Sequence, residues 1–160
     1  IDSDNNALEL LYQFRKDALR EVFEDLQAPL PETRDDIASK DFLSPKEMSK
    51  FFLVLYHGSY LKKGDSNEAL ELLSKTKYKN GLVAGVPSDI IVRHIYGERK
   101  KVLEDGNVAN EFHDCGIFYY TKSPYKLCIM TKANNLSIEK ASEIIANVSK
   151  TVYQSIAGGK

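Results

Sequence analysis

The chain has 160 residues, of which 42% are hydrophobic and 28% are charged, a composition typical of a globular domain with one core. Its formal net charge is -1, so no overall field draws it to nucleic acid or to an anionic membrane surface. No apolar run approaches the roughly 18 residues of a membrane span.

Two short helices are expected at the start of the chain. Apolar residues recur at helical spacing within residues 6–15 and again within residues 17–27. Pro29 and Pro31 end this pair of helices. The polar run 32–41 then has no apolar periodicity and predicts a loop.

The third expected helix opens with a capping box. Ser44 is placed as the N-cap, Pro45 as the first helical residue, and Glu47 as the residue whose side chain closes the box. Gly58 marks the end of this helix, because glycine readily adopts the left-handed conformation found there. A fourth, shorter helix is predicted to start at Asp65.

Beyond Asn80-Gly81 the pattern changes from helix to strand. A β-branched run predicts a strand over residues 90–97, followed by a charged connection over residues 98–110. Residues 112–120 and 125–131 predict two further strands joined by a tight turn. The three strands are expected to form one antiparallel sheet.

A long last helix, capped by Ser137, is the final predicted element. Its apolar residues keep helical spacing over more than five turns: Ile138, Ala141, Ile144, Ile145, Val148, Val152 and Ile156. The chain is therefore predicted to be α+β, with an α-helical part over 1–80 and a sheet and helix part over 81–160. A three-stranded sheet with one long helix leaves a face or an edge uncovered, and uncovered edges pair with other chains. We therefore expect an N-terminal segment, absent from this chain, to complete the domain.

The two cysteines are too few for a disulfide framework and lack the spacing of a metal site, so neither a metal nor a cofactor is expected. The first interpretation is two buried free thiols. The alternative is a disulfide. In a hairpin Cys115 and Cys128 would be diagonal neighbours on one face, and a one-step shift of register would bring them opposite.

Several segments resemble one known family when read together. Ser3-Asp4-Asn5 opens the first predicted helix, His113 to Tyr119 and Pro124 to Thr131 form the predicted hairpin, and residues 144–153 belong to the last helix. Over Ser3 to Tyr153 the chain resembles the C-terminal portion of class A serine β-lactamases and penicillin-recognising D,D-peptidases. The resemblance implies a β-lactamase/transpeptidase-like fold, an extracytoplasmic location and acyl transfer through a covalent serine intermediate.

The resemblance assigns candidate catalytic roles to Ser3 and Asn5. In that family the serine of the SDN motif relays a proton to the leaving nitrogen, and the asparagine positions the amide side chain of the substrate. The alternative is that these residues only cap the helix that follows, because Ser, Asp and Asn are favoured at helix N-caps. The resemblance places the SxxK nucleophile motif upstream of Ser3, so no serine of this chain is expected to be the nucleophile.

The third family motif, Lys-Thr/Ser-Gly, maps to Ile95-Tyr96-Gly97, and these residues together with Glu98 are the candidate substrate-binding residues. Ile95 removes the positive charge that binds the substrate carboxylate, and no rotamer of isoleucine replaces it. Tyr96 puts a ring in place of the small hydroxyl and is expected to occupy the former carboxylate pocket. Gly97 is kept, as close approach of the backbone requires.

Other family features are also expected to be missing. The arginine found on the next strand of many β-lactamases maps near Phe112. Glu32 is the acid nearest to the position of the Ω-loop glutamate, and its side chain is expected to be solvated. His113 is expected to have a structural role. Five basic residues near the altered motif could place a charge in the cleft, although such a run is usually a solvated face: Arg93, His94, Arg99, Lys100 and Lys101.

The sequence leaves two main functions of different class. The favoured one is a degenerate, non-catalytic scaffold or a binder of a cell-wall fragment or a protein partner. The alternative is an active serine hydrolase whose SxxK motif lies on the absent N-terminal segment, and a third interpretation is an unrelated interaction module. The expected partners are a peptidoglycan-like or small acyl ligand and either the missing segment or a second copy, with no nucleic acid.

Overall fold

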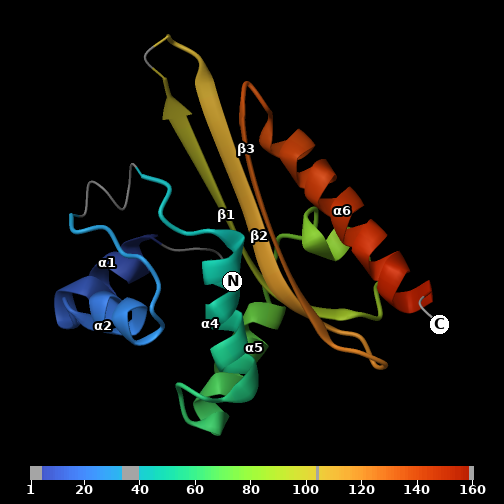
Figure 1. Ribbon diagram of the computed structural model, residues 1–160, viewed down its shortest axis with the longest axis horizontal. Coiled ribbons are helices and arrows are strands. Elements are labelled where there is room, and N and C mark those ends of the chain that lie inside the picture. Colours follow the sequence, from blue (N-terminus) through green and yellow to red (C-terminus); the bar gives the residue numbers. More distant parts are fainter. Residues whose placement is uncertain (1–4, 34–39, 104, 159–160) are drawn as a thin grey trace.

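The structure, a computed structural model, describes residues 5–33, 40–103 and 105–158. Figure 1 shows a long, twisted three-stranded sheet with α6 on one face and α4 and α5 on the other, while α1 and α2 lie beyond α4. The predicted α+β organisation is confirmed, and within the described ranges the elements follow the predicted order of helices, then strands, then a last helix. A 3-10 turn, η1 (Leu82–Gly85), precedes the sheet.

The two N-terminal helices are α1 (Asn5–Phe14) and α2 (Ala18–Asp25), as predicted. Phe23 of α2 is 7% exposed, and its ring packs against the rings of Phe42 and Phe51, with centroids 6.2 and 5.2 Å away. Lys50 Nζ donates to the carbonyl of Gln27 at 2.9 Å. These contacts attach the N-terminal pair to α4.

The predicted capping box begins α4 (Pro45–His57). The backbone N–H of Glu47 donates to Ser44 Oγ at 3.3 Å, and the backbone N–H of Ser44 donates to Glu47 Oε2 at 2.8 Å. Gly58 ends the helix with φ 60°, a left-handed conformation that favours glycine. The next helix, α5 (Lys63–Ser74), starts two residues before the predicted Asp65.

The strands are longer than predicted: β1 spans Ile91–Val102, β2 Val108–Tyr119 and β3 Tyr125–Asn134, in the order β1-β2-β3. The predicted connection over 98–110 is therefore wrong, because β1 and β2 both extend into it. Within this interval Arg99 of β1 forms an ion pair with Glu111 of β2, so a charge that suggested a loop contributes to strand pairing. The same error ended the last predicted strand at Thr131.

Each face of the sheet contributes to a separate apolar cluster. The cluster toward α6 has a buried centre consisting of Leu82, Val92, Phe112, Phe118, Ala141 and Ile145. The cluster toward α4 and α5 is smaller and has at its centre Phe52, Leu70, Cys115 and Ile117. Side chains alternate between the two faces of β2. This strand therefore contributes to both clusters and joins the helical part to the sheet part.

The last helix, α6, spans Ile138–Gly158, and the backbone N–H of Lys140 donates to Ser137 Oγ at 3.1 Å, which confirms the predicted cap. The predicted apolar stripe is partly wrong, since Ile144 and Val148 are 39% and 40% exposed. Small residues replace them on the packed face: a Cβ at Gly85 of η1 would lie 2.5 Å from Ser149 Cβ. No helix in the described ranges is long and apolar enough to cross a membrane.

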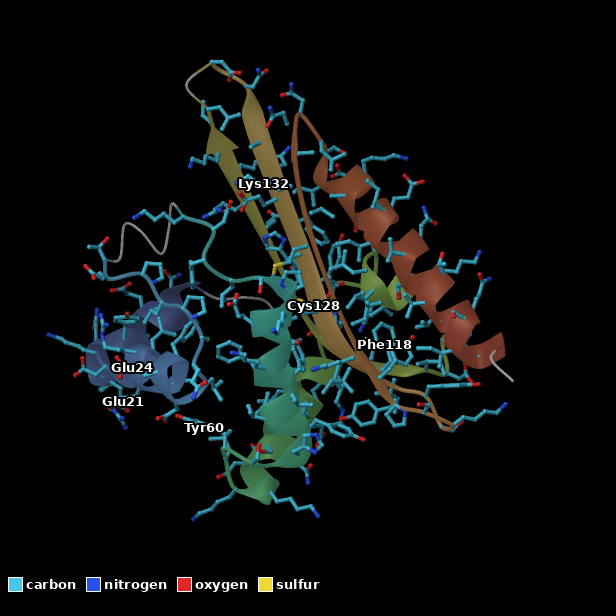
Figure 2. All side chains as sticks on the ribbon, viewed as in Figure 1. Glu21, Glu24, Tyr60, Phe118, Cys128 and Lys132 are labelled. Carbon is cyan, nitrogen blue, oxygen red and sulfur yellow. A yellow bond between two sulfur atoms is a disulfide. The ribbon has the colours of Figure 1, made fainter. Side chains whose placement is uncertain are left out.

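Cys115 and Cys128 form a disulfide between β2 and β3. The interpretation as free thiols is therefore wrong, and so is the diagonal register, because the two residues are direct partners across the strands. Figure 2 shows the bond on the sheet near the start of α4. A shift of one residue in this register would move every side chain of β3 to the other face.

We predict that the isolated 160-residue chain self-associates or requires a further segment. Apolar side chains of α1 stay exposed, with Leu10 at 56%, Leu11 at 66% and Phe14 at 83%, and contiguous exposed apolar surface favours association. Size-exclusion chromatography with light scattering measures this directly. Replacing Leu11 and Phe14 by glutamine should reduce the association, whereas a stable, monodisperse monomer of the unchanged chain would contradict the prediction.

Candidate functional site

A cavity of about 520 Å³ lies between one face of the sheet and the segment that leads into α4. Residues that pair directly across strands point to the same side of a sheet. Three such rows form the wall of the cavity on the sheet: Ile95 with Cys115, Gly97 with His113 and Met130, and Arg99 with Glu111 and Lys132. The segment from Lys40 to Leu43 and the first turn of α4 close it opposite the sheet. Its apolar lining includes Phe42, Leu43, Met48, Ile95 and Met130.

All four predicted substrate-binding residues, Ile95, Tyr96, Gly97 and Glu98, line this cavity. They lie on β1, which is an edge strand of the described sheet. Ile95 is 40% exposed, and a Cβ built on Gly97 would meet no atom within 4 Å. The edge strand therefore presents an aliphatic side chain and an open stretch of backbone to the cavity.

Tyr96 differs from its expected placement. Its ring stacks on the ring of Tyr78 with centroids 4.4 Å apart and lies 6.1 Å from the ring of Phe112, within the cluster toward α6. Successive residues of a strand point to opposite faces, so the Tyr96 ring and the Ile95 side chain lie on opposite faces of the sheet. The expectation that this ring fills a carboxylate pocket is not supported.

Phe112 also faces away from the cavity. It is completely buried in the cluster toward α6, so the position expected near the second family anchor does not reach the site. The residues of β2 that do line the cavity are Glu111, His113 and Cys115. Sequence reasoning selected the neighbouring position because it could not assign the faces of the strand.

Four charged side chains form an ion-pair network at one end of the cavity. Arg99 on β1, Glu111 on β2 and Lys132 on β3 occupy one cross-strand row. Arg99 Nε donates to Glu111 Oε2 at 2.8 Å, and Lys132 Nζ lies 3.0 Å from Glu111 Oε1. Asp41, from the segment before α4, binds both cations through its two carboxylate oxygens.

The members of this network differ in burial and ionisation. The Glu111 side chain is 4% exposed, whereas that of Asp41 is 54% exposed. The hydrogen bond from Lys132 lowers the pKa of Asp41, and the same bond raises the pKa of Lys132. By formal charge, the two cations and two carboxylates of this network balance each other.

His113 lines the cavity between Gly97 and Met130, its direct partners on β1 and β3. Burial lowers the pKa of its imidazole, so the ring is neutral at pH 7 and can both donate and accept a hydrogen bond. Its Nδ1 atom is buried with no hydrogen-bond partner in the described residues. The predicted place at a strand start is wrong, because β2 begins at Val108.

Among the basic residues considered for charge replacement, only Arg99 lines the cavity. The Arg93 guanidinium lies over the ring of Tyr119, 4.4 Å from its centroid. His94 is completely buried on the other face, where its Nδ1 donates to Asp114 Oδ1 at 2.8 Å. Neither side chain brings a charge to the place where Ile95 lies.

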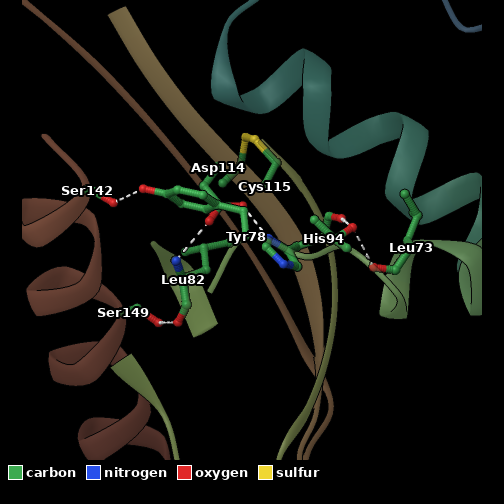
Figure 3. Close-up of polar contacts among 10 residues, drawn as sticks. Leu73, Tyr78, Leu82, His94, Asp114, Cys115, Ser142 and Ser149 are labelled. Atoms are coloured by element: carbon green, nitrogen blue, oxygen red, sulfur yellow. Dashed lines mark hydrogen bonds and ion pairs between the residues drawn. A yellow bond between two sulfur atoms is a disulfide. The ribbon is translucent and has the colours of Figure 1, made fainter. Parts of the chain in front are cut away.

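The His94–Asp114 pair is part of a buried polar cluster that joins the sheet to η1 and α6. Asp114 Oδ2 accepts the backbone N–H of Leu82 at 2.9 Å, and Ser149 Oγ donates to the carbonyl of Leu82 at 2.9 Å. Figure 3 shows these contacts together with the one between Tyr78 and Ser142. The cluster supports the sheet behind the cavity and does not line it.

The candidate catalytic residues are less completely described. Ser3 lies outside the described residues, and Asn5 is the first residue of α1, with a side chain outside the described part. The string Ser-x-x-Lys does occur in the chain, although the nucleophile was expected upstream of it. It is found four times, at residues 59–62, 74–77, 123–126 and 137–140. None of these residues lines the cavity.

Sequence reasoning missed Asp41, Glu111 and Lys132. One signal was available for Glu111. Arg99 and Glu111 carry charges of opposite sign and face each other across β1 and β2 once the hairpin is extended beyond the predicted strand ends. Nothing in the sequence relates Asp41 to this hairpin. Within the described part of the chain, no group of three or more His, Cys, Asp or Glu side chains is arranged to hold a metal ion.

The beta-lactamase enzyme family matches residues 1–156 of the chain, whereas no curated protein matches it. Among solved structures, a class A beta-lactamase from Bacteroides cellulosilyticus is 20% identical and superposes with a TM-score of 0.80, covering 98% of this chain and 60% of that chain. A beta-lactamase from Chitinophaga pinensis is 18% identical and superposes with a TM-score of 0.80, covering 96% of this chain and 61% of that chain.

A third similar structure is a variant of PBP-A, described as an acyl-enzyme complex with penicillin G. It is 18% identical, has a TM-score of 0.68, and the match covers 88% of this chain and 51% of that chain. Identities this low indicate a shared fold. The chain spans between 51% and 61% of the length of these three structures.

Proposed function

The chain belongs to the beta-lactamase enzyme family, and we propose that it is a degenerate member that binds a ligand without catalysing acyl transfer. Its cavity would hold a cell-wall fragment or a related small molecule, and its place of action would be outside the cytoplasm. Fold alone does not carry function. The proposal therefore rests on the residues that line the cavity.

The observation that carries the proposal is the side chain at position 95. The resemblance places a lysine there, whereas this chain has Ile95, which is 40% exposed at the cavity. The nearest cations that line the cavity from the sheet, Arg99 and Lys132, are each paired with Asp41 and Glu111. Losing a preorganised electrostatic group costs about 10²- to 10³-fold in rate.

An active serine hydrolase is the second candidate. The similar PBP-A structure is an acyl-enzyme complex with penicillin G, and Ser3-Asp4-Asn5 matches the SDN pattern. In this reading the nucleophile would lie on a segment outside the chain. Without a cation at position 95, such an enzyme would favour an uncharged ester or amide over a penicillin.

Penicillin labelling of the full-length protein that carries this chain distinguishes the two. The protein is incubated with nitrocefin and, separately, with a fluorescent penicillin followed by intact mass measurement, with an active penicillin-binding protein as the positive control. We expect no nitrocefin turnover and no mass shift under conditions that label the control completely. A covalent penicillin adduct formed at the rate of the control would disprove the proposed function.

A further inference from the structure

The geometry of the charge network points to a second role for the cavity. We propose that Arg99 and Lys132 form a binding site for the carboxylate of a ligand, and that Asp41 occupies this site in the unliganded protein. The inference rests on the proposed function in assuming that the cavity binds a ligand. It names a ligand class, a carboxylate with an apolar body, and the residues that recognise it.

The first argument is the position of Asp41. One of its carboxylate oxygens binds Arg99 and the other binds Lys132, so the group bridges two cations as a bound carboxylate would. Arg99 and Lys132 come from β1 and β3, and Asp41 comes from a segment outside the sheet. Arginine is well suited to planar recognition of carboxylates.

The second argument is the difference between the two carboxylates. Glu111 is buried, with a side chain 4% exposed, and contacts both cations from the middle strand, so it is a permanent part of the site. Asp41 is 54% exposed, and water screens an exposed ion pair so that it contributes little to stability. Exchange of Asp41 for another carboxylate therefore costs little.

The third argument is the charge balance. Among the four described side chains of the network the formal charges balance with Asp41 in place, and displacement of Asp41 leaves Arg99, Lys132 and Glu111 with one net positive charge, which a single carboxylate offsets. Arg99 and Lys132 keep 28% and 47% of their side chains exposed, so both can be reached from the cavity. Met48, Leu43 and Met130 line the same cavity and suit an apolar ligand body.

This site is distinct from the altered motif. Arg99 follows Ile95 by four residues on β1, which places its row about 13 Å further along the sheet at about 3.3 Å per residue. The lysine that the resemblance expects would thus bind an anion elsewhere. A ligand of the size that the cavity admits can contact the Arg99–Lys132 pair and the aliphatic surface of Ile95 together.

The test compares phenylacetate with phenylacetamide, two molecules of the same shape that differ in charge. Met48 and Met130 are the two methionines of the chain and both line the cavity. Their ¹³C-labelled methyl groups, assigned in the full-length protein with Met48→Leu and Met130→Leu, report binding by NMR titration. The proteins compared are the unchanged protein, Asp41→Asn, Lys132→Gln and the control Lys126→Gln, on the same strand but outside the cavity.

We expect phenylacetate to bind more tightly than phenylacetamide. Asp41→Asn should increase the affinity for phenylacetate by up to about fivefold, because it removes an internal competitor worth up to about 1 kcal/mol. Lys132→Gln should reduce the preference for phenylacetate about tenfold, and Lys126→Gln should leave it unchanged. An affinity for phenylacetate that stays the same or falls in Asp41→Asn would show that Asp41 only ties the chain together, and would overturn the inference.

Two further results also overturn the inference. If both probes bind equally well, the cavity binds ligands but does not recognise a carboxylate, and the proposed function stands. If neither probe moves the methionine signals of the unchanged protein or of Asp41→Asn, this cavity is not the carboxylate site. Penicillin labelling would remove the proposed function without changing the outcome of this titration, so the two failures are distinguishable.

Discussion

Asp114→Ala is expected to lower the free energy of unfolding by about 2–6 kcal/mol, because it removes the acceptor of two buried hydrogen bonds. The side chain of Asp114 is completely buried and accepts hydrogen bonds from His94 Nδ1 at 2.8 Å and from the backbone of Leu82 at 2.9 Å. Alanine leaves both donors buried without a partner, at about 1–3 kcal/mol each. Chemical denaturation of the full-length protein measures the loss.

Two matched variants make this prediction specific. Asp89→Ala removes an exposed carboxylate before β1 and should change the stability by no more than about 0.5 kcal/mol. Asp114→Asn keeps an oxygen that can accept one of the two hydrogen bonds, so its loss should be smaller than that of alanine and the protein should still fold. Equal stabilities of the Asp114→Ala and Asp89→Ala variants would refute the role given to the buried cluster.

Ile95→Lys is expected to increase the affinity for benzylpenicillin by about 1.5–3 kcal/mol, or roughly 10- to 150-fold. The new ammonium group would face the cavity from the edge strand and form a charge-assisted hydrogen bond with the carboxylate of the ligand. Because Ile95 is 40% exposed, the ammonium stays hydrated in the unliganded protein and costs little stability. Isothermal titration calorimetry on the full-length protein gives the two affinities.

The control for Ile95→Lys separates charge from shape. Ile95→Met introduces a side chain of similar length without charge and should leave the affinity near that of the unchanged protein. The neutral methyl ester of benzylpenicillin should bind Ile95→Lys and Ile95→Met alike. If the lysine variant binds benzylpenicillin no better than the methionine variant, the loss of a cation at this position does not explain the proposed change of function.

Helix ends were predicted well because the interactions that determine them are local. The capping box of Ser44 and Glu47 and the cap at Ser137 each involve residues three positions apart. Gly58 adopts the left-handed conformation expected of a helix end. Such signals are read from a few neighbouring residues and need no knowledge of the rest of the fold.

Strand ends and strand faces were predicted less well because they depend on partners far away in sequence. The charged end of β1 looked like a loop until Arg99 was placed opposite Glu111. Cys115 and Cys128 required the true register before they became direct partners. Tyr96 was expected to occupy the carboxylate pocket, whereas in the structure its ring stacks on the ring of Tyr78, on the face of the sheet opposite to Ile95.

The amino-acid sequence by itself determined the order of the elements, the helix caps, the family resemblance and the replacement of a cation by Ile95, because each is a property of residue identity or short-range spacing. Only the tertiary structure decided what surrounds that replacement. Asp41 meets Arg99 and Lys132 across separations of 58 and 91 residues. Contacts of that range arise only when the strands are paired and the segment before α4 lies against them, because no local pattern encodes which distant charges will meet.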